Sequence, residues 1–303
     1  MSSVEGVIAG TVRRLRRLRE RSPLVEHIWQ ALLRYDKENG SRLAAATAYY
    51  GFFATFALGV LLLAILGVAW SRTDAPQHTV ELYLRTNFPL LDVHALAEAS
   101  RGISTIAAIA LVFAGIWWVE SMRAAQRALW CLEQHPGNFL VRYLIDLAVL
   151  VGLGLLLAIS LAISLGLQDI LLRLAGDQSR PLTRHALDWS SALLAAGVDL
   201  VIAAALLAGV PRLRIPFRRL LPSALVIVLG LGLLKTAGRW YVSRMTHNPA
   251  YQLAAGAIGL LIFMYLFNQV TLLATALAAT STKGEVRDLA AGPASGAVRR
   301  RLD

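Results

Sequence analysis

Long apolar blocks alternate with shorter polar and charged segments along the chain. A helix that crosses a membrane needs about 20 predominantly apolar residues at a rise of about 1.5 Å per residue. Six blocks approach or exceed that length: roughly 43–70, 103–119, 143–167, 188–210, 222–244 and 251–280. The pattern therefore predicts an all-α polytopic membrane protein with six transmembrane helices.

The polar segments at the two ends of the chain define its predicted organisation. Residues 1–42 are predicted to form a basic amphipathic cytoplasmic segment, residues 43–280 the six-helix domain, and residues 281–303 a flexible cytoplasmic tail. The N-terminal segment carries Val12, Leu15 and Leu18 three residues apart. Arginines stand between and beside them, namely Arg13, Arg14, Arg16, Arg17 and Arg19. Such a helix can lie on anionic lipid headgroups, which we expect here, with RNA binding as the sharper alternative.

The distribution of Lys and Arg predicts which side of the membrane each loop faces. With the N-terminus in the cytoplasm, 21 of the 30 Lys and Arg residues fall on the cytoplasmic side and 7 on the opposite side. Cytoplasmic loops carry an excess of these residues, and an even number of spans returns the C-terminus to the starting side. We therefore predict that both termini are cytoplasmic.

Composition agrees with a membrane protein and excludes several other classes. Hydrophobic residues make up 56% of the chain and charged residues 16%, against about 45–50% and about 25% in soluble domains. The mean hydropathy is +0.57. A net charge of +11 would suggest nucleic acid in a soluble chain, but here the cytoplasmic loops account for it. The single cysteine, Cys131, excludes an internal disulfide and any multi-cysteine metal site.

Three charged residues lie inside the predicted spans. Asp199 belongs to the fourth span, and Lys235 and Arg239 lie one helical turn apart in the fifth. A charge at the centre of a span costs about 2.5–3.5 kcal/mol on insertion scales. Asp199 and Lys235 lie at similar depths in antiparallel neighbours, so the sequence predicts an ion pair between them. Either the pair only neutralises two charges and fixes helix register, or Arg239, left without a partner, offers a cation to an anionic headgroup.

Other polar residues in or beside the spans have simpler interpretations. Asn268 and Gln269 in the sixth span are expected to bond across helices or to line a polar pathway. Asp146 lies at a span end and is expected to be solvated, and Glu120 is expected to pair with Arg123 three residues later. The candidate intramembrane polar site therefore comprises Asp199, Lys235, Arg239, Asn268 and Gln269.

Sequence patterns of catalysis are missing. The six histidines are scattered, with no two at metal-ligand spacing. The chain has no Gly-x-Ser-x-Gly elbow, no phosphate-binding Gly-Lys-Ser/Thr loop and no dinucleotide fingerprint. We therefore expect no enzymatic activity, no catalytic residue, no cofactor and no metal.

Several short motifs resemble those of one bacterial family in their order and spacing. They are LAAATAYY at 43–50, the paired tryptophans at 117–118, MRAAQRALW at 122–130, PRLRIPFRRLLPSA at 211–224, and Tyr251 and Tyr265. The chain thus resembles the YihY/BrkB family of inner-membrane proteins, once labelled ribonuclease BN, over about residues 24–282. The family's closing Gly-Ala-Glu appears here as Ala274-Thr275-Ala276, without the carboxylate. The resemblance implies six spans with both termini in the cytoplasm.

These observations lead to a functional expectation. We expect a multi-pass protein of a bacterial cytoplasmic membrane that transports or flips an anionic amphiphile or lipid-linked molecule, with membrane lipids as partners and no nucleic acid. A non-enzymatic scaffold or envelope-assembly factor is the alternative. The ribonuclease activity of the old family label ranks third, because a metal-dependent nuclease needs clustered ligands.

Overall fold

The computed structural model describes residues 22–70, 105–175, 196–244 and 249–290. Long helices dominate these ranges, as the all-α prediction requires, and two short strands are added. The helices are α2 (Pro23–Lys37), α3 (Gly40–Trp70), α6 (Thr105–Leu129), α7 (Phe139–Ala175), an apolar helix (Ala196–Gly209) whose last turn is the π-helix η1 (Ala205–Gly209), α9 (Phe217–Ser243) and α10 (Pro249–Thr280). Strands β1 (Leu213–Arg214) and β2 (Arg287–Asp288) pair antiparallel.

Each of the six predicted apolar blocks overlaps a helix among the described residues. Five of these helices are long, and the fourth block overlaps the shorter helix Ala196–Gly209. Among the described residues, three stretches are long and apolar enough to cross a membrane: Phe139–Leu156, Phe217–Tyr241 and Ala255–Thr280. Helix α6 continues about ten residues past its predicted apolar block, through a polar segment that ends at Leu129. The number of spans and their orientation remain predictions.

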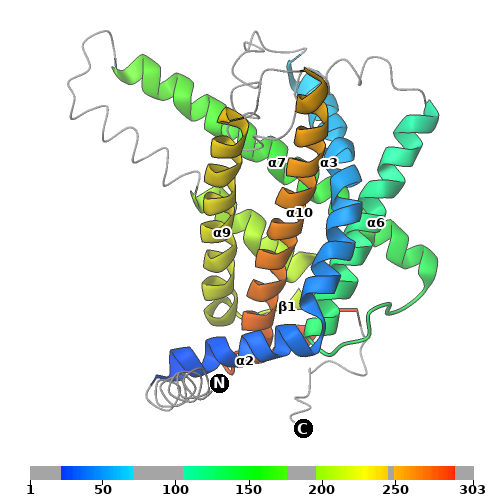
Figure 1. Cartoon of the computed structure of the whole chain (residues 1–303), viewed down its shortest axis with the longest axis vertical. Helices are drawn as coiled ribbons and strands as arrows, with labels where there is room; N and C mark the ends of the chain where they lie inside the picture. The colour runs from blue at the N-terminus through cyan, green and yellow to red at the C-terminus, as the bar shows by residue number, and fades with distance from the viewer. Residues whose placement is uncertain (1–21, 71–104, 176–195, 245–248, 291–303) are drawn as a thin grey trace, which may run out of the picture.

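Helices α3, α9 and α10 stand side by side, and α10 contacts α3, α6 and α9 (Figure 1). Small residues permit close helix contacts in membrane proteins. A Cβ atom added at Gly230 of α9 would lie 2.5 Å from Cγ1 of Val270 on α10, whereas one added at Gly232 would meet no atom within 4 Å. The close contact between α9 and α10 at this position therefore requires glycine, which has no side chain.

Helix α2 lies across one end of the bundle, roughly perpendicular to α3, α9 and α10 (Figure 1). Its inner face packs against α10: Ala31 is buried, and Nε2 of His27 donates a hydrogen bond to the backbone oxygen of Leu277 at 2.9 Å. Its apolar residues Leu24 and Ile28 are exposed. Helix α2 thus has one face on the bundle and one exposed face, and the predicted amphipathic stretch with the arginines between Arg13 and Arg19 lies outside the described residues.

The predicted flexible tail begins with an ordered segment. Residues 281–290 fold back onto the end of the bundle that holds α2 and β1, which we call the α2 end, and there β2 pairs with β1. Val286 and Asp288 are buried in this segment. The expectation of a tail flexible from residue 281 is therefore wrong for its first ten residues, because Val286 and Asp288 provide an apolar and an ionic anchor.

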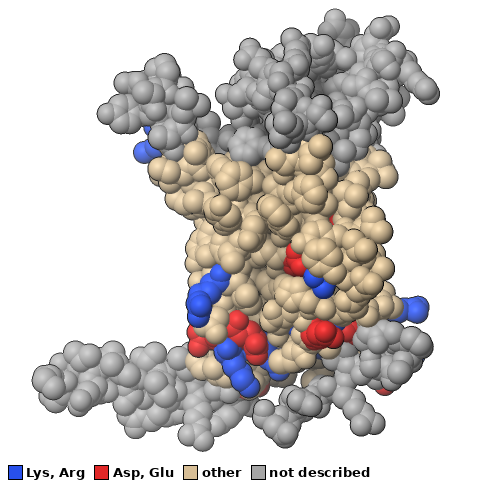
Figure 2. All heavy atoms as spheres, turned by 90° about the vertical axis from the view of Figure 1, so that its right-hand side faces the viewer, with Lys and Arg blue, Asp and Glu red and all other residues tan. Residues whose placement is uncertain are grey.

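The outer surface of the bundle is apolar. Leu225, Leu229 and Leu233 of α9 are exposed and lie four residues apart, on one face of the helix. Figure 2 shows that, on the face it draws, most Lys, Arg, Asp and Glu residues gather toward the α2 end and a broad band of other residues covers the middle. Such a band suits lipid contact, because a soluble protein rarely exposes contiguous apolar surface of this extent.

Candidate functional site

The predicted intramembrane ion pair is present. Nζ of Lys235 lies 3.1 Å and 3.3 Å from the two carboxylate oxygens of Asp199. The side chains are 17% and 26% exposed, so the pair lies at the edge of the contact between α9 and the helix Ala196–Gly209. Lys235 lies six residues before Tyr241, the end of the apolar stretch of α9, and thus ~9 Å from that end. The pair is therefore closer to the end opposite α2.

Arg239 lies one turn beyond Lys235 and is exposed. Its Nη2 atom donates a hydrogen bond to Oγ1 of Thr236 at 3.3 Å. The expectation that Arg239 has no partner is therefore wrong, because a neighbouring hydroxyl on the same helix lies within reach. A guanidinium group carries five N–H donors, so a bond to a hydroxyl is compatible with binding an anion as well.

Asn268 and Gln269 contact other parts of the bundle than the ion pair does. The Asn268 side chain is fully buried and donates to the backbone oxygen of Met264 at 2.7 Å. Its amide oxygen has no hydrogen-bond partner among the described residues. Gln269 is near Ser41 of α3, with its Nε2 atom 3.4 Å from the serine hydroxyl. Gln269 thus bonds across helices as expected, whereas Asn268 bonds within its own helix.

A second group of charges, which the sequence did not reveal, is buried at the α2 end. Nε and Nη2 of Arg123 donate to the two carboxylate oxygens of Asp146 at 3.1 and 2.9 Å, and Nη2 of Arg212 donates to the same carboxylate at 2.9 Å. The Arg123 and Asp146 side chains are 0% and 1% exposed. The expectation of a solvated Asp146 is therefore wrong. The predicted Glu120–Arg123 pair is present at 3.8 Å but is longer than the contacts to Asp146.

Arg127, one turn after Arg123, anchors the C-terminal segment. Its two terminal nitrogens donate to the carboxylate oxygens of Asp288 at 2.9 and 2.6 Å, and Nη1 also donates to the backbone oxygen of Pro211. This one side chain therefore joins α6, the loop before β1 and β2. The sequence offers a partial signal, because Arg123 and Arg127 are four residues apart on one helix face. Their partners are distant in sequence and gave no signal.

Arg219 of α9 makes a third such connection. Its guanidinium donates to the backbone oxygens of Ala278 and Ala279 in the last turn of α10, where a helix leaves carbonyl groups without intrahelical donors; the Ala278 oxygen also accepts from the amide of Ser281. It also lies over the ring of Trp130, with Cζ 4.9 Å from the centroid. The buried arginines at this end thus fasten helix ends and loops to one another.

Burial also perturbs two ionisable groups outside the spans. It lowers the pKa of Arg212 below its ordinary value, and the Asp146 carboxylate opposes this shift. Arg212 also has a positive φ of 59°, a conformation that costs a non-glycine residue about 1–2 kcal/mol. Burial, with a smaller contribution from Tyr265, raises the pKa of Tyr35 to about 12. At neutral pH Tyr35 is therefore neutral.

Possible metal ligands are dispersed in the described part of the chain. No group of three or more His, Cys, Asp or Glu side chains there is placed to hold a metal ion. Cys131 is exposed, with its sulfur 2.9 Å from Nη1 of Arg34.

The long apolar helices and the charges paired within them define a helical membrane protein. A family model described as "Virulence factor BrkB" matches residues 31–297, and the chain belongs to this family. The chain is 22% identical over 291 residues to "Inner membrane protein YhjD" of Escherichia coli K12, a match that covers 86% of this chain and 82% of that protein. It is 24% identical over 302 residues to "Uncharacterized protein Dda3937_02003" of Dickeya dadantii 3937, covering 91% and 88%. No solved structure matches the chain.

Proposed function

We propose that the protein transports or flips an anionic amphiphile or lipid-linked molecule across a bacterial inner membrane and catalyses no chemical reaction. We also propose six spans with both termini in the cytoplasm. Support for the location comes from the similarity to YhjD, which is named an inner membrane protein, and from the apolar helices. Support for the topology comes from the overlap of the six apolar blocks with five long helices and the shorter helix Ala196–Gly209, and from the excess of Lys and Arg on one side.

The observation that carries this proposal is the charged group near the outer end of α9. Asp199 and Lys235 neutralise each other, while Arg239 adds a positive charge one turn further along the helix. Ionisable residues inside membrane helices are costly and commonly mark the path of a substrate or ion. A guanidinium binds phosphate and carboxylate groups through two parallel hydrogen bonds, and this chemistry suits an anionic headgroup.

A scaffold or assembly factor without a substrate is the second candidate. The ion pair itself favours it, because a mutually satisfied Asp199 and Lys235 fix the position of two helices and need no ligand. The two candidates differ in what they require of Arg239. A transporter of anions needs its charge, and a scaffold does not.

The test measures transport by the full-length protein in liposomes, together with complementation of a deletion strain normalised to membrane protein level. The probe is fluorescent phosphatidylglycerol, whose flipping is followed by chemical quenching of the outer leaflet. Under the transport proposal, Arg239→Gln abolishes both activities at normal protein abundance. Arg244→Gln is the matched control, because Arg244 is exposed just beyond α9 and stacks on Trp240. Full activity of Arg239→Gln would contradict the anionic site and favour the scaffold.

A further inference from the structure

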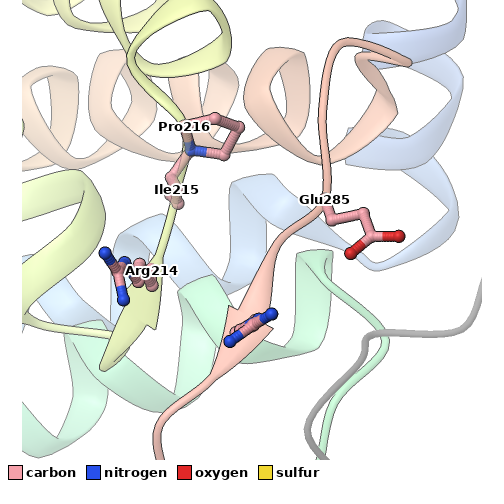
Figure 3. Close-up of a pocket in the computed structure, with 5 residues that line it drawn as sticks. Arg214, Ile215, Pro216 and Glu285 are labelled. Atoms are coloured by element: carbon pink, nitrogen blue, oxygen red, sulfur yellow. The ribbon is translucent and has the colours of Figure 1, made fainter.

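A groove separates the chain before α9 from the segment after α10 at the α2 end. Two adjoining cavities form it, with volumes of about 340 and 760 Å³, and both are lined by Pro216. Figure 3 shows the smaller one. Gly284 faces Pro216 across the groove with a positive φ of 81°, and a Cβ atom there would come within 2.8 Å of the proline ring. The close approach of the two segments therefore requires glycine at this position.

Four basic side chains line this groove and all are exposed: Arg214, Arg218, Lys283 and Arg287. Within the part of the chain that the structure describes, none of the four has an ion pair. Glu285 is the acidic residue of the lining, and its carboxylate points away from Arg214 (Figure 3). The groove therefore carries a strong excess of positive charge.

The register of the two strands concentrates this charge further. Arg214 of β1 is directly opposite Arg287 of β2. Like charges that face each other across an antiparallel pair destabilise it. An anion bound between the two guanidinium groups converts the repulsion into two charge-assisted contacts. The pairing of two arginines is therefore more favourable with an anion present than without one.

The groove lies at the membrane boundary. The apolar stretch of α9 begins at Phe217, and that of α10 ends at Thr280, three residues before Lys283. Phe217 lines the larger cavity and is 69% exposed. Aromatic residues at this depth commonly insert among lipid chains while neighbouring basic residues contact headgroups. Both sides of the groove thus adjoin the layer that contains lipid phosphates.

We propose that this groove binds the phosphate headgroup of an anionic phospholipid. The basic residues contact the phosphate, and Phe217 contacts the upper part of the acyl chains. Phe217 and Lys235 are 18 residues apart on α9, which places the site about 27 Å from Lys235 along the helix, and it requires no transport activity. It is also distinct from the arginines at 13–19, for which headgroup contact was expected from sequence.

The experiment measures lipid binding to the full-length protein in detergent micelles by native mass spectrometry and by the shift in unfolding temperature. The added lipids are phosphatidylglycerol and phosphatidylcholine, and inorganic phosphate and glycerol phosphate are the soluble comparisons. Wild type is expected to bind phosphatidylglycerol at least tenfold more tightly than phosphatidylcholine. The double variant Arg218→Gln/Lys283→Gln is expected to weaken phosphatidylglycerol binding about thirtyfold, because two basic residues near the surface contribute about 1 kcal/mol each and about 1.4 kcal/mol corresponds to a factor of ten.

The matched control is Lys37→Gln/Arg42→Gln, which removes the same charge from exposed positions close to the junction of α2 and α3. It is expected to retain wild-type binding. A second variant, Phe217→Ser, keeps every charge and is expected to weaken lipid binding several-fold without changing any response to soluble phosphate. Equal binding of the two lipids, equal losses in the two double variants, or an equal temperature shift with glycerol phosphate would each overturn the lipid site.

Discussion

One carboxylate at the α2 end is shared by two guanidinium groups. Asp146 accepts hydrogen bonds from both Arg123 and Arg212, and the first of these arginines is fully buried. Burying a charge is costly unless it is paired and hydrogen-bonded, and breaking a buried pair leaves the remaining charge uncompensated. Asp146 is therefore the residue on which this group of charges depends.

Asp146→Asn is expected to destabilise the protein by about 3–5 kcal/mol, because two arginines lose their shared counter-charge. Thermal or denaturant unfolding of the purified protein in detergent measures the loss. Glu120→Gln is the control, since Glu120 is partly exposed and lies 3.5–3.8 Å from its two arginine partners. It is expected to cost about 1 kcal/mol or less. Similar losses of stability in both variants would show that the buried ion pairs of Asp146 stabilise the protein no more than the partly exposed pairs of Glu120 do.

At this scale the sequence predicted one charged pair and missed another for a physical reason. Asp199 and Lys235 lie inside long apolar blocks, where any charge needs a partner, and matching depths in neighbouring helices identified that partner. Asp146 begins an apolar block, where solvation and burial produce the same sequence pattern. Its partners are 23 and 66 residues away along the chain, and only the folded chain brings them together.

Among the helices, the contact of α9 with α10 shows how small residues set spacing. Gly230 lies against Val270, while Gly232, two residues on, faces open space. The two glycines share a helix and differ by about 200° around it, which explains why one packs and the other does not. The segment Gly230-Leu231-Gly232 therefore contains one glycine that packs against α10 and one that makes no such contact.

Gly230→Ala is expected to be less stable than Gly232→Ala by about 1–3 kcal/mol, the usual cost of overpacking. Both substitutions add the same methyl group and gain the same helix propensity, so their difference isolates the contact with Val270. Unfolding temperatures of the two variants in the same detergent provide the comparison. If the two variants unfold at equal temperatures, α9 and α10 are not in close contact at this position.

The positions of the helices were the part of the fold that the sequence predicted best. Apolar length alone located all six blocks, because the hydrophobic pattern of a span does not depend on distant partners. The strands were not predictable, since β1 and β2 contain two residues each and lie 74 positions apart. Their pairing depends on the buried anchors Val286 and Asp288 and on no local strand pattern.

For the molecule as a whole, an apolar band and a charged end together define an orientation. The charges gather toward the α2 end on the face drawn in Figure 2, and both described chain ends, at residues 22 and 290, belong to that end. Basic loops favour the cytoplasmic side. The chain is therefore expected to begin and end in the cytoplasm.

Reporter fusions test this orientation. A phosphatase that is active only outside the cytoplasm, fused after Asp303, is expected to be inactive, and a fluorescent protein at the same position is expected to fluoresce. The same pair of reporters at the N-terminus is expected to give the same result. Phosphatase activity at either end would require an odd number of spans or an inverted chain.

The bond between Arg127 and Asp288 also has a consequence for how the chain is made. During synthesis the ribosome adds Asp288 to the chain 161 residues after it adds Arg127. Throughout that interval Arg127 lacks the Asp288 carboxylate with which it pairs in the folded chain, and burying an unpaired guanidinium group is costly. The α2 end is therefore expected to close only after synthesis is nearly finished. A chain that ends between residues 281 and 287 would contain every apolar block and lack the ion pair between Arg127 and Asp288.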